Sequence, residues 1–278
     1  MGLGMAHRLL GAGFPLAVFN RTQEKAATLV VEGAKVAGNP AEAAKGAEII
    51  VSMVADDSAS RAVWLGWHGA LAGVARGALL IECSTLTPEC ISELAKAAAK
   101  RGCELLDAPV TGTKIHAASG ELCFLVGGSA QGLERALPAL KVMGRAVVHV
   151  GPGGSGALLK LINNFLCGVQ AAALSEALAV IQKGGLDREK ALGVLMNGAP
   201  GSPLMKTLLS RINANDYTPN FRLSLMVKDL DYSLKEGERH GISLAMVASA
   251  LKAFKEAEAA GHGAKDFAAV VEPLCKHC

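Results

Sequence analysis

Residues 1–22 read MGLGMAHRLLGAGFPLAVFNRT and combine a Gly-x-Gly, a helix-like stretch and an apolar run. The stretch that starts at Gly2 does not match the Gly-x-Gly-x-x-Gly pattern of a phosphate loop, because the third glycine is replaced by His7. A second register fits better. In it, Gly2 is the third glycine of such a loop, the helix after the loop follows, and a strand begins at Pro15. We therefore expect a dinucleotide-binding chain that starts part-way through its phosphate loop.

In this register Gly4 is an incidental helix residue, and Asn20-Arg21-Thr22 falls at the carboxyl end of the second strand. The adenosine ribose of a dinucleotide lies at that place in a doubly wound sheet. The first strand and the first two glycines are missing from this register. Because that strand is central, we expect exposed edges on its neighbours and weakened cofactor binding. Either the natural start lies upstream of Met1, which we favour, or this is a truncated form.

Short apolar runs alternate with helix-like segments up to about residue 150. Such alternation predicts a mostly parallel sheet that is covered on both faces, that is, a Rossmann-type doubly wound α/β domain over residues 1–150. The runs are PLAVF (15–19), AEIIVSMV (47–54), GALLIEC (77–83), GCELLDAPV (102–110), ELCFLVGG (121–128) and AVVHVG (146–151).

The pattern changes after GPGGSG (151–156), where strand-like alternation stops. An all-α domain is predicted for residues 151–278, with a long interdomain helix at its start. Its expected helices cover about 155–183, 187–197, 203–213, 224–240 and 243–260.

Composition excludes several classes of protein. A net charge of +3 without a basic run argues against nucleic-acid binding. The apolar stretch 158–182 is interrupted by polar residues such as Lys160 and Glu176, so we expect a buried helix and no membrane span. Seven scattered cysteines and no secretory signal favour the cytoplasm. The terminal CKHC has metal-like spacing, but without a second ligand cluster no metal site is expected.

The segments MGLGMAHRLL and VFNRT resemble the β-hydroxyacid dehydrogenase family. The resemblance implies that Gly2, Asn20, Arg21 and Thr22 bind the cofactor. Members with Asn-Arg-Thr at this place generally use NADP, and Arg21 and Thr22 can hold a 2′-phosphate. We therefore expect NADP(H) in preference to NAD(H). The alternative is that Arg21 is an ordinary surface arginine after a strand.

Two further segments resemble cofactor loops of the family. In MVADDSAS (53–60) the backbone of Met53 and Val54 would line the cofactor, although Ala55 replaces the usual proline. In ECSTLTPE (82–89) the resemblance implies that Thr85 contacts the nicotinamide ribose. The same stretch is also an ordinary helix start, capped by Thr87, and both interpretations can hold together.

The most specific segment is DAPVTGTKIHAASGELCFLVGG (107–128). The resemblance implies that Thr111, Gly112 and Thr113 bind the substrate carboxylate through a glycine-containing turn. Thr113 and His116 stand where 3-hydroxyisobutyrate-type members often have glycine, and the glyoxylate and succinic semialdehyde type is more permissive there. His116 itself is a minor catalytic candidate.

Two charged segments complete the resemblance. In GPGGSGALLKLINN (151–164), Lys160 and Asn164 share one helix face and would be the catalytic lysine and a substrate-binding residue. In FRLSLMVKDLDYSLKEGERHGISLAM (221–246), Lys228 would reach the cofactor and Asp229 would support it. Without the resemblance, a surface lysine, a core asparagine and a charged helix face would explain these residues.

These observations predict an oxidoreductase that transfers hydride between NADP(H) and a small β-hydroxyacid or semialdehyde carboxylate. The glyoxylate, succinic semialdehyde, 3-hydroxyisobutyrate and tartronate semialdehyde types are open. The alternatives are an imine reductase and a non-catalytic binding or assembly module. Since the helices after residue 155 offer more apolar surface than one small domain buries, we expect a homodimer or homotetramer.

Overall fold

The computed structural model describes residues 1–275. The chain forms two compact units, Met1–Lys160 and a second unit that begins at Leu161. The division falls inside the long helix α9 (Ser155–Lys183), whereas the sequence pattern placed it at residue 150.

The first unit contains a six-stranded sheet and a separate two-stranded sheet. In the larger sheet β3, β4 and β5 are parallel, β7 runs antiparallel to β5 and β6, and β8 is parallel to β7. The sheet is therefore less uniformly parallel than expected. Its strands are β3 (Ile49–Ser52), β4 (Leu79–Glu82), β5 (Glu104–Asp107), β6 (Val110–Thr111), β7 (Leu122–Gly127) and β8 (Gly144–Gly151).

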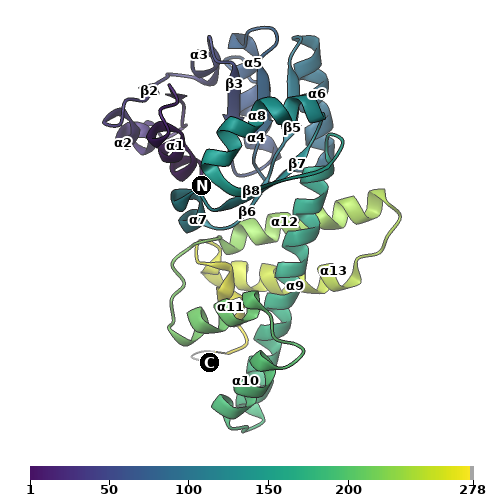
Figure 1. Ribbon diagram of the computed structural model, residues 1–278. Helices are drawn as coiled ribbons and strands as arrows, with labels where there is room; N and C mark the ends of the chain where they lie inside the picture. The colour runs from purple at the N-terminus through teal and green to yellow at the C-terminus, as the bar shows by residue number, and fades with distance from the viewer. Residues whose placement is uncertain (276–278) are drawn as a thin grey trace. The chain divides into compact units, whose positions relative to one another are not determined.

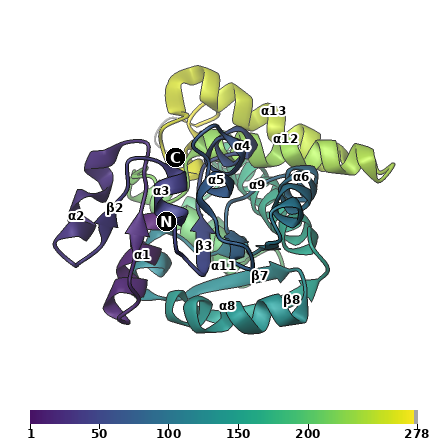
Figure 2. The same cartoon turned by 90° about the horizontal axis from the view of Figure 1, so that it is seen from above.

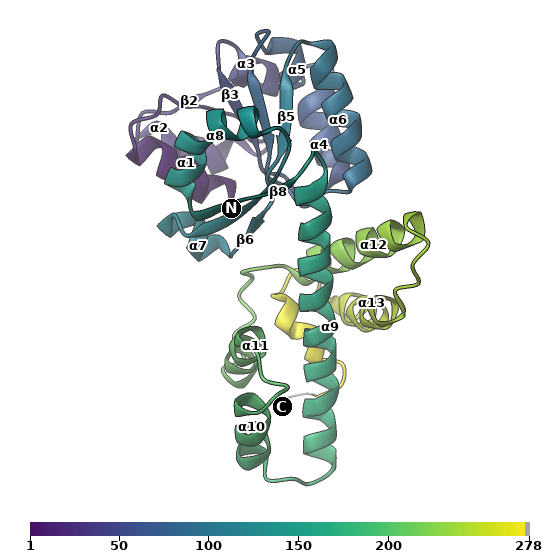
Figure 3. The same cartoon turned by 45° about the vertical axis from the view of Figure 1, so that its right-hand side comes forward.

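Helices cover both faces of this sheet, which confirms the doubly wound fold. Leu79 and Ile81 of β4 enter the core beneath α1 (Gly2–Gly11) and α8 (Ala130–Met143). Leu80, between them, enters the opposite core beneath α4 (Asp57–Leu65) and α6 (Pro88–Lys100). Figure 3 shows the two helical layers, and Figure 2 shows β7 and β8 side by side along α8.

The smaller sheet consists of β1 (Ala17–Val18) and β2 (Lys35–Val36), which pair in parallel with each other alone among the described strands. β1 and β3 thus each have an edge without a strand partner in residues 1–275, as the sequence led us to expect. Leu16 and Ile49 are only partly buried there. Strand β2 was not predicted, because two residues are too short to show a periodic pattern.

Short helices connect these strands. Several helices of the first unit, short and long, begin after a residue whose side chain accepts a hydrogen bond from the backbone. Asn39, Asp56, Thr87 and Ser129 each accept a backbone N–H three residues on, as helix N-caps do. The short helices are η1 (Gln23–Ala26), α2 (Ala27–Val30), α3 (Pro40–Ala44), α5 (Ala70–Gly73) and α7 (Lys114–Ser119).

Helix α1 packs closely against α7, and this contact corrects the interpretation of Gly4. A Cβ at Gly4 would lie 2.9 Å from the backbone carbonyl carbon of Ala117 and 2.9 Å from the backbone nitrogen of Ala118. Gly4 is therefore required for the approach of the two helices, and it is not an incidental helix residue. The contact joins segments more than a hundred residues apart, so the local sequence could not show it.

The second unit is all-helical, as expected, and the buried residues of its core are mostly alanine and branched aliphatic side chains, with Phe254 as the buried aromatic residue among those described. Helices α12 and α13 lie side by side in Figure 1, and η3 packs against both. Besides the distal part of α9, the elements are α10 (Arg188–Asn197), α11 (Pro203–Asn213), α12 (Leu223–Arg239), α13 (Ala245–Ala257), η2 (Glu258–His262) and η3 (Phe267–Val271).

Helix α9 is long and apolar enough, by length and composition alone, to cross a membrane. Half of its most apolar window is buried, and Leu174, Leu178 and Ile181 lie in the core of the second unit. The core helix of a soluble protein passes the same test, so the finding is weak evidence for a membrane span.

The α1–α7 contact predicts opposite effects for two glycines of one helix. Gly4→Ala should lower the free energy of unfolding by about 1–3 kcal/mol, because the new methyl meets backbone that cannot retreat. Gly11→Ala, where the same methyl meets nothing within 4 Å, should raise it by up to about 1 kcal/mol. Urea denaturation of both variants measures this difference, and equal effects would contradict the packing argument.

Candidate active site

The turns after β3 and β4 are tied together by hydrogen bonds. The backbone N–H of Val54 donates to Ser84 Oγ at 2.7 Å, and the N–H of Ser84 donates to Glu82 Oε1 at 2.9 Å. The structure thus brings the Met53–Val54 turn next to the turn that carries Thr85. Both follow the carboxyl ends of parallel strands, where doubly wound folds bind their ligands.

Glu82 lies beneath both turns and is fully buried. Its Oε2 accepts hydrogen bonds from Ser60 Oγ at 2.6 Å and from Trp64 Nε1 at 2.7 Å. A buried carboxylate with several donors makes a rigid polar cluster, because each group would be costly to leave unpaired. This cluster was not predicted, although a glutamate that ends the apolar run LLIE was a signal for it.

The other predicted cofactor residues of the first unit either begin helix α1, as Gly2 does, or follow strand β1, whereas Lys228 lies in the second unit. A Cβ on Gly2 would be 3.6 Å from Met53 Cβ, so the start of α1 lies beside the end of β3. After β1, Asn20 Nδ2 donates to the Thr22 carbonyl at 2.6 Å. The side chains of Arg21 and Thr22 are exposed.

These residues fit a nicotinamide dinucleotide. Arg21 makes no hydrogen bond or ion pair with any residue that the structure describes, so its guanidinium is available to a phosphate. At the end of β3, the buried hydroxyl of Ser52 has no hydrogen-bond partner within residues 1–275. A buried polar atom of this kind needs a partner, and a ligand at this edge would supply one.

The predicted substrate turn, Thr111–Gly112–Thr113, begins at the end of β6. Thr111 pairs with Cys123 of β7, Gly112 adopts a φ of +115° that favours glycine, and Thr113 caps α7. The two hydroxyls and the turn therefore occupy one short, well-defined segment.

Asp107 links this segment to helix α9. It is fully buried, its Oδ1 accepts the Gly154 N–H at 2.7 Å, and its Oδ2 accepts the Ala157 N–H at 2.8 Å. Burial raises the pKa of Asp107, and the N–H donors of Gly154 and Ala157 offset part of that effect. Room for the carboxylate depends on Gly127, where a Cβ would lie 2.5 Å from Oδ1.

Lys160 lies on α9 one turn beyond Ala157, and its side chain is partly buried. The carboxylate that ends β5 thus fixes the start of the helix that carries the predicted catalytic lysine. No role could be predicted for Asp107 within its motif, because its carboxylate and the two N–H donors are 47 and 50 residues apart in the sequence.

In the second unit, Asn164 and Asp229 form a buried polar cluster with Lys228. Asn164 Nδ2 donates to Asp229 Oδ2 at 2.6 Å, and Asn164 Oδ1 accepts from Asn163 Nδ2 at 2.9 Å. The Lys228 ammonium lies 2.8 Å from Asp229 Oδ1 and 4.7 Å from the centre of the Tyr232 ring. Asp229 therefore does pair with Lys228, and Asn164 keeps only part of its hydrogen-bonding capacity for a substrate.

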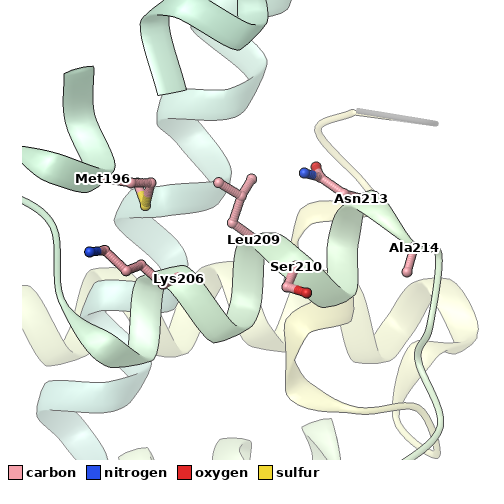
Figure 4. Close-up of a pocket in the computed structure, with 6 residues that line it drawn as sticks. All are labelled: Met196, Lys206, Leu209, Ser210, Asn213 and Ala214. Carbon is pink, nitrogen blue, oxygen red and sulfur yellow. The ribbon is translucent and has the colours of Figure 1, made fainter. Parts of the chain in front are cut away.

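The remaining candidate sites are less suited to catalysis or to metal binding. Within residues 1–275 no group of three or more His, Cys, Asp or Glu side chains could hold a metal ion, and Lys276, His277 and Cys278 of the CKHC sequence lie outside the described residues. Burial raises the pKa of the Cys90 thiol to about 12, which makes it a poor nucleophile. Figure 4 shows an open hollow of about 530 Å³ in the second unit that contains none of the predicted site residues; it is lined by Met196, Lys206, Leu209, Ser210, Asn213 and Ala214.

Two family models match the chain, one in each half. Residues 1–151 match the family described as the NAD binding domain of 6-phosphogluconate dehydrogenase. Residues 154–274 match the NAD-binding domain of NADP-dependent 3-hydroxyisobutyrate dehydrogenase. Both matches indicate an oxidoreductase that binds a nicotinamide dinucleotide.

Individual relatives extend over nearly the whole chain. Glyoxylate/succinic semialdehyde reductase 1 of Arabidopsis thaliana is 34% identical over 99% of this chain and 95% of its own length. The 3-hydroxyisobutyrate dehydrogenase of Pseudomonas aeruginosa is 37% identical over 97% and 94%. The structure of the Mycobacterium tuberculosis 3-hydroxyisobutyrate dehydrogenase with L-serine has a TM-score of 0.90 at 28% identity, covering 99% of this chain and 96% of that one. The chain belongs to the β-hydroxyacid dehydrogenase family.

The double acceptor role of Asp107 predicts that an amide cannot replace it. Asp107→Asn offers one oxygen and sets its NH₂ against a backbone N–H. It should lower the free energy of unfolding by about 1–3 kcal/mol. Asp187, the exposed N-cap of α10, accepts one backbone N–H, from Lys190. Asp187→Asn should change stability by less than about 0.5 kcal/mol, since asparagine caps helices as well as aspartate. Thermal denaturation compares the two variants, and a harmless Asp107→Asn would refute the double-acceptor role.

Proposed function

We propose that this protein reversibly reduces small aldehydes that bear a carboxylate, with NADP(H) as cofactor. The observation that carries the proposal is the position of Asp107. Its carboxylate ends the strand that leads to the Thr111–Gly112–Thr113 turn and also fixes the start of the helix that carries Lys160. One buried group thus ends the strand before the turn proposed for the substrate carboxylate and fixes the start of the helix that carries the proposed proton donor.

Lys160 is the general acid in this proposal. When bound, a nicotinamide would supply hydride for the carbonyl carbon, and the Lys160 ammonium would give a proton to the carbonyl oxygen. A lysine is ordinarily charged at neutral pH. Reduction should therefore be favoured near pH 7, and oxidation of the alcohol, which needs neutral Lys160, at alkaline pH.

The substrate carboxylate binds at the Thr111–Gly112–Thr113 turn through hydroxyl and backbone donors. Asn164 lies four residues after Lys160 on the same helix and orients the reacting end with the hydrogen-bonding capacity that Asn163 and Asp229 leave free. The contact of Lys228 with the cofactor stays a prediction.

A second copy of the chain is the proposed protein partner. On α9 the exposed residues Leu159, Leu166, Ala173 and Val180 recur every seven positions, the spacing of helices that pack side by side. Leu166 is 51% exposed and Val180 68%. This stripe supports a homodimer or homotetramer, and sedimentation equilibrium measures which one forms.

The exposed guanidinium of Arg21 predicts the cofactor preference. Arg21→Ala should raise the KM for NADPH about tenfold or more, for the loss of a charged hydrogen bond, and leave the KM for NADH nearly unchanged. Arg101→Ala is the matched control, because Arg101 is exposed and precedes β5, away from the carboxyl ends of the strands. Initial rates with each cofactor measure both constants. An equal loss for NADPH and NADH would show that Arg21 does not contact a 2′-phosphate.

The catalytic role of Lys160 is tested with glyoxylate and the semialdehydes of succinate, tartronate and methylmalonate. Lys160→Ala should lower kcat by about 10²- to 10⁴-fold. NADPH affinity, measured by its fluorescence, should stay the same. Lys183→Ala, at the exposed far end of α9, should keep full activity. Wild-type activity in Lys160→Ala would refute the mechanism. NADPH binding without turnover of any aldehyde would favour a binding module, and turnover of a cyclic imine alone would favour an imine reductase.

A further inference from the structure

We propose that His116 is the positioning residue that fixes the Thr111–Gly112–Thr113 turn for the substrate carboxylate, and that it does so only while its imidazole is neutral. The inference rests on the proposed function, because it assigns a partner to the turn that the function uses. It concerns how the turn keeps its shape.

The imidazole of His116 reaches back over the turn. Its Nδ1 accepts the backbone N–H of Thr113 at 3.0 Å and lies 3.0 Å from Thr113 Oγ1. A glutamate or glutamine at the third position of a helix often accepts the N–H of the capping residue in the same way. His116 takes that place in α7, so one ring atom holds both polar groups of Thr113.

Close packing on both sides holds the backbone around His116 in place. The residue after His116, Ala117, is fully buried, and its backbone lies against Gly4 of α1. On the other side, a Cβ on Gly112 would lie 3.1 Å from His116 Cβ and 3.2 Å from Leu122 Cδ2. The turn is thus confined between His116 and strand β7, and α7 cannot shift to relieve a change in the ring.

The hydrogen bond requires one protonation state. A backbone N–H can only donate, so Nδ1 must be without a proton and the neutral ring carries its proton on Nε2. In the imidazolium both nitrogens are donors, and Nδ1–H would face the N–H of Thr113. The imidazolium could still donate to Thr113 Oγ1, but the Thr113 N–H would lose its acceptor, and the turn would be held less firmly.

Charged groups surround α7. Lys114 belongs to the same helix, and Glu121 follows it. From α1, which packs against α7, Arg8 lies beside Gly120, and the α-amino group of Met1 interacts with Lys114. Lys114, Arg8 and the Met1 ammonium are cationic and Glu121 is anionic. Burial, and then the charge of Lys114, lower the pKa of the Met1 α-amino group.

This interaction also connects the two departures from the family pattern. Thr113 and His116 both stand where 3-hydroxyisobutyrate-type members often have glycine, and the contact between Thr113 Oγ1 and His116 Nδ1 needs both side chains. The structure assigns them to one device, which stiffens the turn by side-chain contact where two glycines would leave it more flexible. We therefore expect the pair to affect the KM of the aldehyde more than kcat or the KM of NADPH.

The test compares wild type, His116→Gln and His116→Ala with the aldehyde that turns over fastest, between pH 5.5 and 8.5. In the wild type the aldehyde KM should rise about fivefold or more from pH 7.5 to 5.5, while the KM of NADPH stays constant. His116→Gln keeps an acceptor that does not titrate, so its KM should be low and independent of pH. His116→Ala should have a KM about tenfold higher at every pH.

A second measurement does not need turnover. Amide hydrogen exchange of the segment 110–118, followed by mass spectrometry at pH 7.5, should be slow in the wild type and in His116→Gln and faster in His116→Ala. A pH-dependent aldehyde KM in His116→Gln, or unchanged exchange in His116→Ala, would overturn the inference. A wild type without any aldehyde reduction would instead overturn the proposed function, and the exchange result would still decide the role of His116.

Discussion

The buried carboxylate of Asp107 is the constraint on which the first unit depends. It comes at the end of a parallel strand and accepts two N–H groups from the start of α9. Those donors would otherwise be unpaired, because the first N–H groups of a helix have no partner within it. A carboxylate at this depth carries a desolvation cost, which appears as its raised pKa and which the two hydrogen bonds partly offset. Neither Asp107 nor the start of α9 can therefore move alone.

Glu82 is a second buried carboxyl group, at the end of the neighbouring strand β4, and hydrogen bonds again offset the cost of its burial. Within residues 1–275 no cation pairs with it, and its oxygens accept hydrogen bonds from a hydroxyl, an indole N–H and a backbone N–H. These donors come from α4 and from the turn after β4, and Ser84 extends the cluster to Val54. Two strand ends thus carry buried carboxylates that fix turns through dipoles. Because these hydrogen-bond donors are already oriented, they hold the turns in place before a ligand binds, and they do not compete with the ligand's charged groups for partners.

The sequence was sufficient for the features that have a period or a local motif. The predicted helices 155–183 and 203–213 agree with α9 and α11 to the residue, because an apolar stretch and the glycine, proline and asparagine breaks that bound it are local signals. Strand β2, helix α4 and the role of Gly4 were missed. A two-residue strand has no period, and the space available to Gly4 is set by Ala117, which lies far away in the sequence. The polar partners of Asp107, Glu82 and Asn164 are likewise distant residues.

The substrate turn shows what tertiary structure adds to a motif. The sequence placed Thr113 and His116 as two separate departures from the family pattern and weighed His116 as a catalytic group. In the structure the ring nitrogen nearest the turn already accepts the N–H of Thr113, so it is not available to take a proton from a substrate without breaking that bond. To hold the turn, His116 Nδ1 must keep its hydrogen bond from the Thr113 N–H. To take a proton from a substrate, the same nitrogen would have to give up that bond. The geometry therefore favours positioning as the role of His116, and Lys160 remains the proposed proton donor.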